Sequence, residues 1–137
     1  MVEIEEIQHY LMKHCPFLFS PNQFRIVDSD SSESFGNAFL VLEHKNLRLK
    51  FIKDKGQLFL DFQPMSSNRK KDWFSIDIVM QLVTGNIESS SEMDTDKAKF
   101  IKSNLDEIQR LFSSPNLEVT IKKLRELERA RAKRLFG

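Results

Sequence analysis

The sequence predicts one α+β domain over residues 1–137: a four-stranded antiparallel sheet (meander) with an N-terminal helix and three C-terminal helices, packed mainly on one face. Two observations lead to this fold class. Residues 37–62 place apolar side chains at every second position, the period of strands, whereas the flanking segments repeat them every three or four residues, the period of helices. A chain of 137 residues is also long enough to bury one hydrophobic core.

The N-terminal segment predicts a helix over residues 2–14. Ile4, Ile7 and Leu11 recur at helical spacing, and three glutamates occupy the first turn, where the helix dipole favours acids. Pro16 limits this helix. Residues 23–28 then predict a short strand, and the Ser- and Asp-rich stretch 29–37 predicts a polar loop.

Three further strands are predicted in the stretches NAFLVLEH, NLRLKFIK and QLFLDFQ, and pairing fixes their register. Two-residue loops at 45–46 and 55–56 place residues of similar or complementary character opposite each other on both faces of the sheet. The expected cross-strand pairs are Glu43 with Arg48, Phe39 with Ile52, Lys50 with Asp61, and Ile52 with Phe59. An odd loop in the second hairpin would place Leu49 against Asp61. Because a one-residue slip moves every side chain to the other face, we expect the even loops.

Three C-terminal helices follow an exposed loop over 64–72. The first begins at Ser75 as N-cap, stops at Gly85, and is apolar nearly all round, so we expect it to be deeply buried. The second runs from about Asp94 to Phe112. The third starts near 114–115 and runs to about Leu135, with an apolar stripe that is interrupted only by Arg131.

Residues that could support catalysis are few and scattered. Cys15 is the only cysteine and the three histidines show no metal-binding spacing, so we expect no metal, no cofactor and no enzymatic activity. Cys15 could act as a nucleophile beside His14, but neighbouring helix residues point about 100° apart, so a buried structural thiol is favoured. Asp61 could act as a general base, but its pairing with Lys50 is favoured.

Charge is unevenly distributed along a chain whose net charge is only +1. Residues 1–34 carry six acids and two bases, net −4, and residues 118–137 carry seven bases and three acids, net +4. We expect these ends to attract each other or to stay solvated. The start of the chain lacks signal-peptide features, and no apolar run approaches the ~18 residues of a membrane span, so we expect a cytoplasmic protein without a membrane partner.

A nucleic-acid binder is the alternative function. It would use the loop cluster Arg69, Lys70, Lys71 and Trp73 together with the basic C-terminal helix. We favour the interpretation that Trp73 anchors the following helix and that the last helix is solvated and laced with ion pairs. A small-molecule binder with a pocket between the sheet and the helices is a third possibility, although no polar residues converge there.

The side chains at alternate strand positions form a mixed face, made of Phe39, Val41, Glu43, Arg48, Lys50, Ile52, Phe59 and Asp61. Its apolar strip consists of Phe39, Val41, Ile52 and Phe59. Helices on the opposite face cannot also cover this strip, so either the last helix wraps round it or another chain binds it. An apolar centre with a charged rim is typical of protein interfaces. We therefore predict that Phe39, Val41, Arg48, Lys50, Ile52, Phe59 and Asp61 contact another protein or a second copy of this chain.

The stretches GNAFLVLEHKNLRLKFIKDKGQLFLDF and DWFSIDIVMQLVTG combine strands of this type with a tryptophan-led helix. In this they resemble small uncharacterised bacterial proteins found among the immunity proteins of polymorphic toxin systems. The resemblance covers roughly a third of the chain. It implies a cytosolic, non-enzymatic protein that binds and neutralises a toxin, and it supplies no binding residues.

Overall fold

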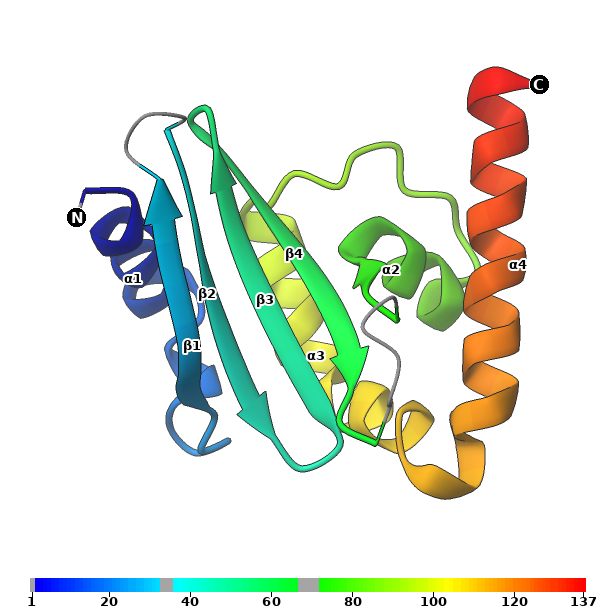
Figure 1. Ribbon diagram of the computed structural model, residues 1–137. Helices are drawn as coiled ribbons and strands as arrows, with labels where there is room; N and C mark the ends of the chain where they lie inside the picture. The colour runs from blue at the N-terminus through cyan, green and yellow to red at the C-terminus, as the bar shows by residue number, and fades with distance from the viewer. Residues whose placement is uncertain (1, 33–35, 67–71) are drawn as a thin grey trace.

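A computed structural model describes residues 2–32, 36–66 and 72–137 (Figure 1). In chain order the elements are α1 (Val2–His14), η1 (Pro16–Leu18), β1 (Arg25–Ser32), β2 (Asn37–His44), β3 (Leu47–Asp54), β4 (Gln57–Pro64), β5 (Phe74–Ser75), α2 (Ile76–Thr84), α3 (Thr95–Leu111), η3 (Ser114–Asn116) and α4 (Leu117–Phe136). The α+β class and the antiparallel sheet are confirmed. None of the helices in the described ranges is long and apolar enough to cross a membrane.

The sheet has five strands rather than the predicted four, in the order β1-β2-β3-β4-β5. The added strand β5 pairs Ser75 with Asp61 and Phe74 with Phe62. Two residues are too few to show a period, so the sequence pattern could not reveal this strand.

The first strand is also longer than predicted. β1 runs through Ser32, so residues 29–32 belong to the sheet and not to a loop, while 33–35 lie outside the described residues. Ser29, Asp30 and Ser31 pair with Leu40, Phe39 and Ala38 of β2. Pairing with a well-formed neighbouring strand has overridden the turn preference of serine and aspartate.

The predicted register of the hairpins is confirmed. Glu43 faces Arg48 and Lys50 faces Asp61, and both loops contain two residues. In the second loop Lys55 and Gly56 have φ of 50° and 86°. Positive φ at both central positions is the conformation that matches a tight turn to the twist of the strands.

The main core lies between the sheet and the helices, and α2 and α4 contribute Ile78, Val79 and Leu124 to it. Leu49, Phe51 and Leu60 are fully buried on the core-facing side of the strands. Helices α1 and α3 cover this side, and Ile7 of α1 and Ile101 of α3 are fully buried there (Figure 1). The helices α2 and α4 continue the fold past the β5 edge, so the expectation that all helices pack mainly on one face holds for only two of them.

The helix ends follow the sequence signals. The Asp94 Oδ1 accepts a hydrogen bond of 2.8 Å from the Lys97 backbone N–H, and Gly85 closes α2 with φ of 79°. Only the first half of α2 is deeply buried, at Ile76–Val79; Met80, Leu82 and Val83 are half-buried. The prediction of a deeply buried helix is therefore correct for that half alone.

Candidate functional site

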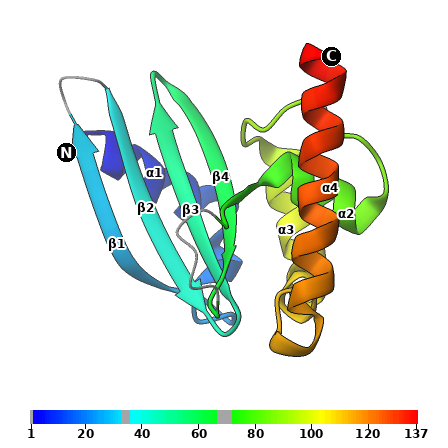
Figure 2. The same ribbon diagram turned by 45° about the vertical axis from the view of Figure 1, so that its right-hand side comes forward.

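The mixed face lies on the side of the sheet opposite α1 and α3 and looks toward the viewer in Figure 1. Helix α4 stands beside α2, beyond the β5 edge, in both views (Figures 1 and 2). Among the described residues, no helix crosses β2, β3 and β4 on this side. The last helix therefore does not wrap round the apolar strip.

The apolar strip is a hydrophobic cluster separate from the main core. Phe39, Ile52 and Phe59 are half-buried, and Val41 is 6% exposed. None of the four belongs to the main core or packs against it. The structure thus places these predicted residues together on one surface, where they contribute little to the central packing.

Lys50 lies at the centre of the mixed face between two aromatic rings. Its Nζ is 4.6 Å from the ring centroid of Phe39 and 5.5 Å from that of Trp73. Such cation–π contacts stabilise by roughly 0.5–2 kcal/mol each. Lys50 and Asp61 face each other in the register, as predicted, and the charge of Lys50 opposes the rise in the pKa of Asp61, although the two described side chains form no direct salt bridge. Lys50 instead joins the strip to Trp73.

Trp73 is a member of this surface that strand alternation could not identify. It precedes β5 and packs its ring beside Lys50. It also lines one depression with Val41 and Arg48. The expected role of Trp73 as a helix anchor is thus supplemented by a role in covering part of the mixed face.

A polar row closes one end of the mixed face. The Arg48 Nε donates to Glu43 at 3.1 Å and its Nη1 donates to Gln63 at 3.0 Å, while Arg25 lies 3.7 Å from Glu43. The predicted pairing of Glu43 with Arg48 is confirmed. Because these side chains hydrogen-bond to one another, Arg48 acts as part of the rim and not as a free cation.

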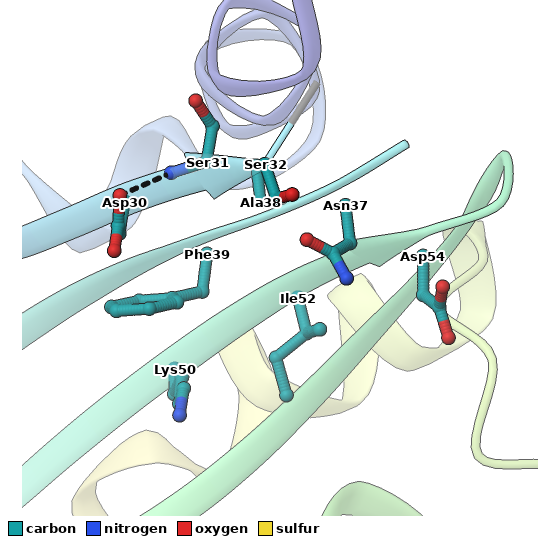
Figure 3. A pocket seen from close by; sticks show the side chains of 9 residues that line it. All are labelled: Asp30, Ser31, Ser32, Asn37, Ala38, Phe39, Lys50, Ile52 and Asp54. Atoms are coloured by element: carbon teal, nitrogen blue, oxygen red, sulfur yellow. Dashed lines mark hydrogen bonds between the residues drawn. The ribbon is translucent and has the colours of Figure 1, made fainter. Parts of the chain in front are cut away.

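An acidic groove of about 280 Å³ opens at the other end of the mixed face (Figure 3). It is lined by Asp30, Ser31, Ser32, Asn37, Ala38, Phe39, Lys50, Ile52 and Asp54. Figure 3 shows Phe39 and Ile52 in its middle, with Asp30 on one side and Asp54 on the other. Both aspartates are exposed. The groove combines an apolar floor with two acidic edges and one lysine, Lys50, and it lies on the face away from α1 and α3.

Asp61 of the mixed face has a raised pKa. Burial raises its pKa; Asp77 and Glu128 add to the rise, whereas Lys50 and Arg131 oppose it. No described residue donates a hydrogen bond to its side chain. In the described part of the chain, no group of three His, Cys, Asp or Glu side chains could hold a metal ion.

Cys15 is a buried thiol, as predicted. Its exposed fraction is 0%, and burial raises its pKa to about 12. The neighbouring His14 contacts the ring of Tyr10, with 4.7 Å between centroids. The thiolate needed for nucleophilic attack is therefore strongly disfavoured here.

The nucleic-acid candidates fall into two groups. Arg69, Lys70 and Lys71 lie outside the described residues. On α4, Arg125 and Arg131 turn toward Asp72 and Asp77 of the body, with N–O distances of 2.6 and 2.8 Å. The other bases of α4 are exposed, namely Lys122, Lys123, Arg129, Lys133 and Arg134.

Comparisons with protein-family models, with curated proteins and with solved structures found no match to this chain.

Proposed function

We propose that this chain is a non-enzymatic protein-binding domain of the cytosol and that the mixed face is its contact surface. One observation carries the proposal. The apolar strip stands apart from the main core, and no helix of the described ranges covers it. Apolar surface that a fold gathers on one side, within a polar rim, is the usual composition of an interface.

The charges around the strip favour a protein over a nucleic acid. Glu43 is paired with Arg48, whereas Asp28, Asp30 and Asp54 are exposed at the edges of the mixed face. These would repel phosphates, and the central cation, Lys50, is already placed over two rings. A partner with apolar and basic side chains fits this surface better. A toxin-neutralising immunity protein is the specific form of this function that the sequence resemblance implies.

Photocrosslinking tests the proposal directly. A photoreactive residue at Ile52 should give covalent adducts with another protein chain, and excess unlabelled wild-type protein should suppress them. Met12 provides the matched control, because it is an apolar residue of α1 that is 65% exposed on the other side of the molecule. Adducts of equal yield from both positions would contradict the proposal.

Affinity for the crosslinked partner gives the quantitative test. Phe59→Asp should weaken binding at least about tenfold, equivalent to about 1.4 kcal/mol, whereas Met12→Asp should leave it unchanged. Nucleic-acid binding should be weak, sequence-independent and lost at physiological salt, since such affinity falls steeply with salt. Nanomolar binding to DNA or RNA at that salt would favour the alternative function.

A further inference from the structure

The opposite charges of the two ends of the chain do not meet within one molecule. Helix α1 and strand β1 lie at one side of the fold and α4 lies at the other (Figures 1 and 2). The excess acid and the excess base thus occupy opposite flanks. Unlike charges separated in this way favour contacts between copies of the chain.

The last two turns of α4, residues 129–136, form a basic tip with exposed apolar side chains. Leu135 and Phe136 are 66% and 88% exposed, and Arg129, Lys133 and Arg134 are also exposed. At spacings of seven and three residues, Arg129 and Lys133 share the helix face of Phe136. An exposed phenylalanine beside two cations is the chemical complement of an apolar floor with acidic edges.

We infer that the α4 tip of one copy docks in the acidic groove of a second copy. Phe136 would lie on Phe39 and Ile52, with Lys133 and Arg129 toward Asp30 and Asp54. Asp30 and Asp54 stand two strands apart, roughly 10 Å, and are offset by two residues along the strands, roughly 7 Å. The two carboxylates are therefore roughly 12 Å apart, which is close to the diameter of a helix with its side chains. This inference rests on the proposed function and names the partner of the mixed face.

The tip cannot serve the groove of its own chain. The groove lies over β1, β2 and β3, whereas α4 is tied beside α2 by Arg125–Asp72 and Arg131–Asp77. The groove is lined by Ser32 and Asp54, the last residues of β1 and β3. The C-terminal end of α4 lies at the same end of the molecule (Figure 1). Two copies related by a two-fold axis can therefore insert their tips reciprocally, which gives a closed dimer and not a filament.

Sedimentation velocity on the full chain tests this arrangement. The wild type should change from monomer to dimer as the protein concentration rises from about 1 µM to about 1 mM. Added salt should weaken the dimer because it screens the charges. Phe136→Asp on the tip and Asp54→Lys in the groove should each raise the dimer Kd at least about tenfold. Val119→Asp is the control, since Val119 is 59% exposed near the start of the same helix.

A charge exchange tests the specific contact. Asp30→Lys and Lys133→Glu should each weaken the dimer, and the double variant should regain it. A wild type that stays monomeric throughout, a dimer indifferent to Phe136→Asp, or a double variant without recovery would each overturn the inference. A monomeric chain that still crosslinks through position 52 to a different protein would refute the dimer and leave the proposed function standing.

Discussion

The Arg131 guanidinium donates a hydrogen bond of 2.8 Å to the Asp77 carboxylate and a second of 2.8 Å to the Ser75 hydroxyl. Asp77 is only 6% exposed, and no described residue donates to its Oδ1. Arg131 interrupts the apolar stripe of α4 between Leu127 and Leu135. The interruption therefore marks an inward-facing ion pair that fixes α4 to the start of α2.

Breaking this pair should destabilise the fold. Arg131→Met should lower the free energy of unfolding by about 3 kcal/mol, since it leaves a buried carboxylate without its cation. Urea unfolding followed by circular dichroism measures the change.

Two further variants isolate the ion pair. Asp77→Asn in the Arg131→Met background should recover most of the loss. Arg129→Met, an exposed neighbour on the same helix, should cost no more than about 0.5 kcal/mol. Equal losses for Arg129→Met and Arg131→Met would show that the ion pair does not hold α4.

The two phenylalanines at the ends of the segment 59–62 should differ sharply in their tolerance of charge. Phe59 is half-buried on the mixed face and outside the main core, so Phe59→Asp should cost the isolated chain only about 1–2 kcal/mol. Phe62 has an exposed fraction of 0% in the main core, so Phe62→Asp should prevent folding. Thermal melting of both variants checks this, and similar melting temperatures would mean that the mixed face is packed like the core.

The register of the sheet was predictable because both of its faces constrain it. A shift of one residue would have put Leu49 against Asp61, and no such mismatch occurs in the observed pairing. Helix boundaries were predictable where a local cap sets them, as at Asp94 and Gly85. These features depend on residues close together in sequence or on a strict period.

The structural features that depend on residues far apart in the sequence were not predictable. Residues 29–32 have turn-forming side chains and yet form a strand, because β2 supplies their hydrogen-bonding partners. Trp73 joins the mixed face through Lys50, and the acidic groove brings Asp30 together with Asp54. The sequence around each of these residues does not indicate which residue it contacts in the fold.

The thiol of Cys15 should react only when the chain unfolds. Its pKa of about 12 and its complete burial keep it protonated and inaccessible at pH 8. Ellman's reagent should therefore leave the native protein unmodified and label it at once in concentrated urea. Met12→Cys, on the exposed side of the preceding helix α1, is the positive control. Rapid labelling of native wild-type protein would show that α1 opens readily.

Asp61 should make the stability of the fold depend on pH. Folding raises the pKa of its carboxyl group from the ordinary value of 3.8, with burial as the largest cause. The folded chain therefore binds more protons than the unfolded chain between 3.8 and the raised value. The favourable contribution is fully present below the ordinary pKa and is lost as the pH rises through the folded-state pKa.

Asp61→Asn removes this dependence and should raise the melting temperature at pH 7, where the wild-type carboxylate is charged and poorly solvated. The gain should vanish below the ordinary pKa of 3.8, because the wild-type group is then neutral as well. Lys50→Met removes a cation that lowers the pKa of Asp61, so it should increase the loss of stability between pH 3 and pH 7. The double variant Lys50→Met/Asp61→Asn should show no such increase over Asp61→Asn. A lower melting temperature for Asp61→Asn at pH 7 would mean that its carboxylate is stabilised in the folded chain by partners that offset its burial.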